Sequence, residues 1–127
     1  MSILSHACVG TNDRAKSAKF YDAALGALGV NNLGDFGGMA TLYGIDTPDF
    51  IVFTPTDGNP ATVGNGGTIG FNAATRDAVH KFHEAGLAAG GTCDGEPGPR
   101  DFSPTAYAAY LRDPDGNKIC TYCFAEE

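Results

Sequence analysis

The stretch Arg14-Ala-Lys-Ser-Ala-Lys-Phe-Tyr-Asp-Ala-Ala-Leu-Gly-Ala-Leu-Gly29 returns 62 positions later as Arg76-Asp-Ala-Val-His-Lys-Phe-His-Glu-Ala-Gly-Leu-Ala-Ala-Gly-Gly91, with seven of the sixteen positions identical. Such a repeat indicates two copies of one supersecondary unit. Two copies are too few for a solenoid, so we expect them to pair within one closed domain. The seam between two such halves is a natural place for a ligand cleft.

The first copy is part of a longer predicted unit. Alternating apolar residues predict a strand over 3–10, and Asn12 or Asp13 can cap a helix that ends at Gly29. The segment after this helix is rich in turns and strand-like, with strands expected over 39–45 and 50–54. The first unit therefore reads β-α-β-β-β.

The second copy restarts the same pattern. A strand is expected over 68–73, followed by a helix that Thr75 caps and that Gly90-Gly91 ends. Glycines and prolines predict that residues 93–104 are largely loop, and the last strands are expected over 105–112 and 118–124. The chain is thus expected to be a single α+β domain, residues 1–127, with repeat units 1–55 and 68–127 and a glycine-rich linker over 56–67.

Composition limits the functions that the chain can have. At 127 residues with 43% hydrophobic and 18% charged residues, it has the composition of a soluble globular domain without a membrane span. A signal peptide is not evident, so we expect a cytoplasmic protein whose four cysteines are reduced. The net charge of −7 disfavours nucleic acid and anionic membranes as partners, and it suits a cationic ligand.

Three motifs together resemble one known family. They are the opening Leu4-Ser-His6, the helical Phe20-Tyr21-Asp22 and the closing Asp113-Pro-Asp-Gly-Asn-Lys-Ile119. With the paired units, they make the chain similar to the vicinal oxygen chelate superfamily of glyoxalases, bleomycin-resistance proteins and extradiol dioxygenases, and specifically to its small bacterial glyoxalase-like members. The resemblance implies a curved, mostly antiparallel sheet around a cavity, a small-molecule ligand and a homodimer.

The resemblance also implies a divalent metal, Ni, Zn, Fe or Mn, held by the first and last strands of each unit. The matching positions carry His6, Thr68, Val52 and Cys120. Only His6 is a ligand of the family type, because Val52 has no donor atom and a threonine hydroxyl is a poor ligand. Three of the four matched positions therefore depart from the family's ligand pattern.

Other residues are candidates for catalysis or ligand binding. His6 can act as a general acid or base, and Cys8 or Cys120 could be a thiolate that an imidazole activates. Arg100 on a proline-rich loop can orient a carboxylate or phosphate. Apolar walls and hydroxyls for a pocket are expected from Thr68, Phe53, Phe102, Tyr107, Tyr110 and Tyr122. We read His80 and His83, although spaced i,i+3, as surface and stripe-edge residues of a helix.

Two functions follow from these observations. The first is a glyoxalase-like enzyme, a lyase or isomerase related to lactoylglutathione lyase, acting on a small carbonyl or thiol-adduct metabolite with His6 as its catalytic residue. The alternative is a metal-free protein that binds or sequesters a small molecule, as bleomycin-resistance members do.

Overall fold

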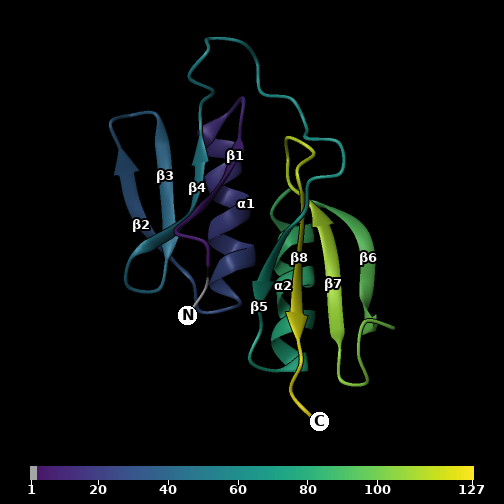
Figure 1. Ribbon diagram of the computed structural model, residues 1–127. Coiled ribbons are helices and arrows are strands. Elements are labelled where there is room, and N and C mark those ends of the chain that lie inside the picture. The colour runs from purple at the N-terminus through teal and green to yellow at the C-terminus, as the bar shows by residue number, and fades with distance from the viewer. Residues whose placement is uncertain (1–2) are drawn as a thin grey trace.

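The computed structural model describes residues 3–127, so the first two residues of the predicted 1–55 unit lie outside the described residues. The chain forms two β-α-β-β-β modules (Figure 1). The first module contains β1 (Ala7–Gly10), α1 (Arg14–Gly26), β2 (Asn31–Phe36), β3 (Ala40–Gly44) and β4 (Pro48–Phe53). The second contains β5 (Ile69–Asn72), α2 (Arg76–Ala88), β6 (Thr92–Pro99), β7 (Tyr107–Arg112) and β8 (Lys118–Cys123). Neither helix is long and apolar enough to span a membrane within the described part of the chain.

The internal repeat corresponds to equivalent structural elements. An offset of 62 residues superposes the bounds of β1 on those of β5 and the bounds of α1 on those of α2. The modules then diverge, because residues 100–106 between β6 and β7 form a longer connection than residues 37–39 between β2 and β3. This loop provides about half of the extra length of the second module, and β6, β7 and the turn before β8 provide the rest.

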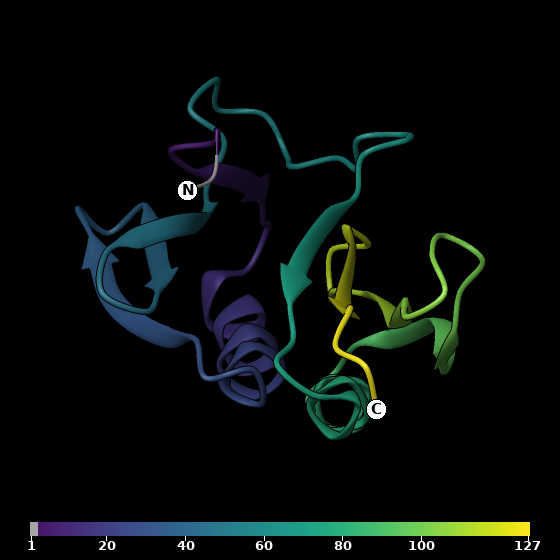
Figure 2. The same ribbon diagram turned by 60° about the horizontal axis from the view of Figure 1, so that its bottom comes forward.

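Each module contributes one four-stranded sheet, in the orders β1-β4-β3-β2 and β5-β8-β7-β6. The pairs β1–β4 and β5–β8 are parallel, and the other neighbours are antiparallel. The two helices lie side by side on one side of the sheets, as both ribbon views show (Figures 1 and 2). The expected α+β fold is confirmed. Its strands form two separate sheets, because β1 is an edge strand of one sheet and β5 is an edge strand of the other.

The core lies between the helices and the two sheets. Its central cluster contains Phe20, Tyr21 and Leu25 of α1, Phe82 of α2, and side chains from the strands of both modules, including Val52, Leu111 and Ile119. Residues that alternate with these strand residues face the opposite, open side of each sheet. That open side is where a ligand can approach.

Two predicted boundaries differ from the structure at the start of the chain. The first strand begins at Ala7 instead of residue 3, because its partner β4 offers paired positions only from Phe50 to Phe53. Asp13 caps α1 as expected and accepts a hydrogen bond from the Lys16 amide, but the helix ends at Gly26 instead of Gly29. Gly29 follows in the left-handed region, with φ of 81°, where glycine has no steric penalty.

The prediction of a loop over 93–104 is wrong for its first half, where β6 forms. β6 is the edge strand of its sheet, and an edge strand tolerates prolines, which have no N–H to donate, because one of its sides is unpaired. Its pairing with β7 shifts register between Cys93 and Gly95 and again between Gly95 and Gly98. Glycine and proline are compatible with such an irregular edge strand.

The turn over Asp113–Asn117 ties the two modules together. The buried Asp113 carboxylate accepts hydrogen bonds from the Tyr21 hydroxyl at 2.6 Å, from the Asn117 side chain at 2.9 Å, and from the amides of Asp115 and Asn117. The Asn117 side chain also donates to the Gly10 carbonyl of β1 at 2.9 Å. This motif, the most specific part of the family resemblance, therefore has a structural role.

Candidate functional site

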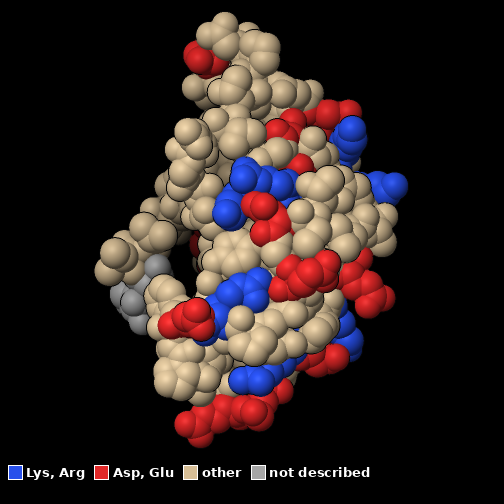
Figure 3. Space-filling view, turned by 90° about the vertical axis from the view of Figure 1, so that its right-hand side faces the viewer, with Lys and Arg blue, Asp and Glu red and all other residues tan. Residues whose placement is uncertain are grey.

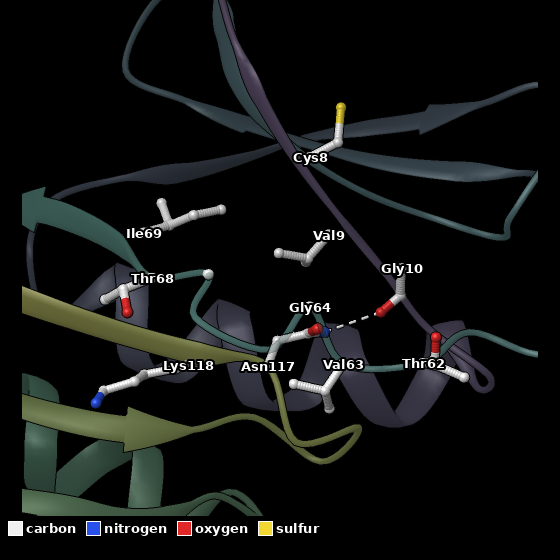
Figure 4. A pocket seen from close by; sticks show the side chains of 11 residues that line it. Cys8, Val9, Gly10, Thr62, Val63, Gly64, Thr68, Ile69, Asn117 and Lys118 are labelled. Atoms are coloured by element: carbon white, nitrogen blue, oxygen red, sulfur yellow. Dashed lines mark hydrogen bonds between the residues drawn. The ribbon is translucent and has the colours of Figure 1, made fainter.

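A cavity of about 360 Å³ occupies the seam between the modules, where a cleft was expected. Its walls come from β1, from residues 62–68 and from the start of β5 and β8 (Figure 4). Val9 and Ile69 provide apolar surface, while Asn117 reaches across the seam to the Gly10 carbonyl. Glycine backbone forms part of the remaining wall, and Cys8, Thr62, Thr68 and Lys118 add polar side chains.

A second hollow of about 340 Å³ lies on the open face of the second sheet and is lined by aromatic rings. Strand alternation produces it, because Ile119 and Cys123 of β8 face the helices while Cys120 and Tyr122 face the open side. Tyr110 lies opposite Cys120 on β7. The lining residues are Gly70, Phe71, Asn72, Phe102, Tyr110, Tyr122 and Phe124.

Gly70 keeps the floor of this aromatic pocket open. It pairs with Cys120 across β5 and β8, and a Cβ atom at position 70 would lie 3.3 Å from the Cys120 Sγ atom. Any larger side chain would therefore extend over the thiol and narrow the pocket. The pocket depends on a glycine at this position.

The aromatic rings of the pocket contact one another in series. The Tyr110 and Tyr122 hydroxyls lie 2.6 Å apart, and the Phe124 ring stacks on Tyr122 with a centroid separation of 5.5 Å. Phe102 meets Tyr122 edge-on at 6.0 Å, although 79% of its surface remains exposed. Phe124 is 47% exposed. Exposed aromatic surface gathered around a hollow is typical of a binding site.

The pocket lining carries no charged side chain, but two cations flank it. The Arg100 guanidinium lies 5.6 Å and the Lys118 ammonium 5.2 Å from the centre of the Tyr110 ring. Acidic and basic side chains are interspersed over the outer face of this module (Figure 3). Local charge at the pocket thus favours a neutral or anionic ligand, whereas the net charge of the chain alone suggested a cation.

Tyr110 and Cys120 favour their neutral forms, because the pKa of each is raised. Burial and the hydrogen bond with Tyr122 raise the pKa of the Tyr110 hydroxyl above its usual value. Burial also raises the pKa of the Cys120 thiol, although Tyr110, Lys118 and Arg100 partly offset this effect. A neutral thiol is a weak nucleophile, so these residues provide hydrogen bonds more readily than covalent chemistry.

Arg100 is engaged within its own loop. Its guanidinium donates to the carbonyls of Glu96, Gly98 and Pro99 at 2.9 to 3.2 Å. These bonds hold the end of β6 against Tyr110 and so position the loop that carries Phe102. The structure places Arg100 beside the pocket, with its observed hydrogen bonds made to protein carbonyls.

The other predicted site residues lie elsewhere. His6 is exposed just before β1 and pairs with the Ser5 hydroxyl at 2.9 Å, while Thr68 lines the seam cavity. Phe53 belongs to β4 in the first module. Tyr107 packs toward the helices, where its hydroxyl lies 2.6 Å from the His80 Nε2 atom. The structure brings together five of the predicted residues, Arg100, Phe102, Tyr110, Cys120 and Tyr122.

The residues at the positions matched to metal ligands do not fit a divalent cation. Val52 is 1% exposed and belongs to the central core, so the open face of β4 carries Ile51 and Phe53 beside it. Cys120 lies beneath the aromatic pocket of the second module, and His6 lies at the edge of the first. Cys8, also considered as a thiolate, borders the seam cavity on β1. These positions therefore do not form a metal-ligand set of the family type.

Sequence reasoning missed four lining residues, Gly70, Phe71, Asn72 and Phe124. The signal for Gly70 and Asn72 was their alternation on β5, but it becomes informative only when their pairing with Cys120 and Tyr122 is known. Phe124 ends the last predicted strand, and alternation from Cys120 and Tyr122 is a signal that could have placed it on the same face. For the residues of β5, the missing information is the register between distant strands.

Comparison with known proteins identifies the family. The sequence model of the Glyoxalase/Bleomycin resistance protein/Dioxygenase superfamily matches residues 3–121. The chain belongs to this superfamily. No curated protein matches the chain.

Solved structures of superfamily proteins resemble the whole chain. A glyoxalase/bleomycin resistance protein from Albidiferax ferrireducens T118 is 47% identical with a TM-score of 0.86, and the match covers 96% of this chain and 98% of that one. A glyoxalase-related enzyme from Fulvimarina pelagi is 19% identical with a TM-score of 0.72, covering 97% and 88%. A lactoylglutathione lyase from Agrobacterium tumefaciens is 17% identical with a TM-score of 0.66, covering 97% and 94%. At such low identities the last two likenesses show the fold alone.

Proposed function

We propose that this superfamily member binds a small molecule with a flat apolar part, which inserts among Phe102, Tyr110, Tyr122 and Phe124. This function corresponds to metal-free binding or sequestration of the bleomycin-resistance type. The observation that carries the proposal is the cluster of partly exposed aromatic rings around one uncharged hollow. The Tyr110 and Tyr122 hydroxyls and the Asn72 side chain provide the few polar groups that orient a ligand.

The exposed rings give such binding a source of free energy. Complete burial of a phenylalanine side chain stabilises by about 1.5–3 kcal/mol, and Phe102 still exposes 79% of its surface. Stacking against an aromatic ligand adds about 0.5–1.5 kcal/mol per ring pair. The flanking Arg100 and Lys118 favour a ligand that is neutral or carries a negative group at its edge.

The same geometry supports binding better than the alternative, a glyoxalase-like lyase. A general base must come within hydrogen-bond reach of the proton that it removes. Tyr110 and Cys120, whose pKa values are raised, are poor bases at neutral pH, and His6 lines neither hollow. Steady turnover of the glutathione hemithioacetal of methylglyoxal, reduced by His6→Ala, would favour the lyase instead.

A panel of aromatic carboxylates and neutral aromatic compounds tests the proposal. Binding is measured by thermal shift and by tyrosine fluorescence, which is readable because the chain has no tryptophan. For a compound that binds, we expect Phe102→Ala to weaken the affinity by about tenfold, equivalent to about 1.4 kcal/mol. Phe36→Ala is the matched control, because Phe36 is also an exposed phenylalanine but lies on β2 of the first module. Equal affinity of Phe102→Ala and wild type would refute the location of the site.

A further inference from the structure

A second group of reactive side chains lies on the helix side of the second sheet, apart from the aromatic pocket. Cys93 of β6 pairs with Leu111, whose side chain is buried in the core beneath the helices. Because directly paired residues share one face of a sheet, Cys93 points toward α2. There it meets His83, which is 5% exposed. His83 is thus a buried residue facing β6, not a surface residue.

The irregular edge strand brings a third residue to the same place. Residues three apart on a regular strand point to opposite faces, so Glu96 would normally face away from Cys93. The two register shifts in β6 fall between Cys93 and Gly98 and re-aim the strand. The Cys93 Sγ atom consequently lies 3.7 Å from the Glu96 Oε1 atom.

The three side chains lie close to the separations that a tetrahedral cation requires. His83 Nε2 lies 3.2 Å from Cys93 Sγ, and the three donor atoms all lie within 4.8 Å of one another. Zinc bonds of about 2.3 Å to sulfur and about 2.0–2.1 Å to nitrogen or oxygen place tetrahedral ligands about 3.5 Å apart. A cation therefore needs only small rearrangements of these side chains to bind.

We propose that His83, Cys93 and Glu96 form a binding site for a divalent cation of the zinc class. Thiolate, imidazole and carboxylate are the donors that Zn²⁺ takes in proteins, whereas Mg²⁺ and Ca²⁺ prefer oxygen alone. Three protein ligands leave one position for water or another small ligand. The Cys93 thiol releases its proton to solvent on binding.

Access and support at the site are consistent with reversible loading. Cys93 and Glu96 are exposed, so an ion can enter directly from solvent. His83 is held on α2, which packs against both β6 and β7. His80, the other histidine of the helix, is engaged with the Tyr107 hydroxyl at 2.6 Å. A bound ion would cross-link α2 to the edge strand whose far end carries Arg100.

Cobalt is a direct probe of this site. Titration of the purified chain with Co²⁺ alone is expected to give one equivalent of bound metal, with the near-ultraviolet band of a cobalt–thiolate bond and the strong visible bands of tetrahedral cobalt. Zn²⁺ should displace the cobalt and abolish these bands. Absence of the thiolate band at saturating Co²⁺ would overturn the proposal.

Matched variants identify the ligands. Loss of a group that merely orients a metal ligand typically weakens binding about 10–100-fold, so we expect Cys93→Ser to weaken Zn²⁺ binding by at least about tenfold and to remove the thiolate band. Cys8→Ser, at another exposed cysteine, should leave both unchanged. Persistence of the band in Cys93→Ser would show that cobalt binds elsewhere and would overturn the proposal.

Two further variants complete the test. Glu96→Gln and His83→Gln should each weaken Zn²⁺ binding while retaining the thiolate band at high Co²⁺. Because His83 is buried and its variant could fail to fold, the exposed Cys93 and Glu96 decide the outcome, with circular dichroism as the check on folding. Unchanged Zn²⁺ affinity in both exposed variants would refute the site. The aromatic pocket is separate, so ligand binding there should survive Cys93→Ser.

Discussion

The hydrogen bond between Tyr21 and Asp113 tests how the two modules are joined. Tyr21 is fully buried in α1, and its hydroxyl donates to the Asp113 carboxylate of the second module at 2.6 Å. Tyr21→Phe removes this donor and preserves the ring that packs against Phe20 and Phe50. A hydrogen bond to a charged group contributes about 1.5–3 kcal/mol. We expect the free energy of unfolding to fall by that amount.

Tyr43→Phe is the matched control. The Tyr43 ring is equally buried, but its hydroxyl donates at 2.9 Å to Asp22, an exposed carboxylate that water can solvate after the change. We therefore expect a smaller loss, about 0.5–1.5 kcal/mol. Urea unfolding followed by circular dichroism measures both values, and the melting temperature should fall by roughly 3–5 °C per kcal/mol. A loss for Tyr21→Phe no larger than that for Tyr43→Phe would refute the role of Asp113 as the link.

Two further predictions concern the aromatic pocket and the thiols. In Gly70→Ala the new Cβ atom would lie 3.3 Å from the Cys120 Sγ atom, so the free energy of unfolding should change by less than about 1 kcal/mol. The same variant should weaken ligand binding. Unchanged affinity in a titration would contradict the role of Gly70 in the pocket floor. In native protein at neutral pH, an aromatic disulfide reagent should modify the exposed Cys8 and Cys93 quickly and the buried Cys120 and Cys123 slowly. Because burial raises the pKa of Cys120, its modification rate should increase as the pH is raised, and rapid modification at neutral pH would contradict the assignment.

Local patterns were sufficient to predict the architecture. The repeat around Phe20 and Phe82 located both helices, and Asp13 and Thr75 cap them as expected. Strand-like stretches located six of the eight strands, whereas β2 was given no range of its own and β6 was expected to be loop. There, glycine and proline indicated a loop, but an edge strand with shifted register tolerates both. The loop preference of glycine and proline was overridden because β6 pairs with β7 at the edge of the sheet. The residues of β6 alone do not encode that pairing.

The sites depend on register, and this explains where prediction failed. Tyr107 and Tyr110 belong to one strand, yet one packs toward the helices and the other lines the pocket. The face that each occupies follows from pairing with β8, and a shift of one residue would exchange them. The His83–Cys93–Glu96 cluster needs a helix and two register shifts together. Spacing along the sequence cannot reveal such a juxtaposition.

The most direct test of the central claim is a titration of the protein with a binding aromatic ligand, followed by NMR of selectively labelled phenylalanine and tyrosine side chains. Ligand binding in the aromatic pocket predicts that the largest shifts affect Phe102, Tyr110, Tyr122 and Phe124, with Phe36 unchanged. This placement of the ligand would be contradicted if the chemical-shift changes of the aromatic rings were confined to the first module. It would also be contradicted if only the methyl signals of Val9 and Ile69, which line the seam cavity, changed in a companion spectrum.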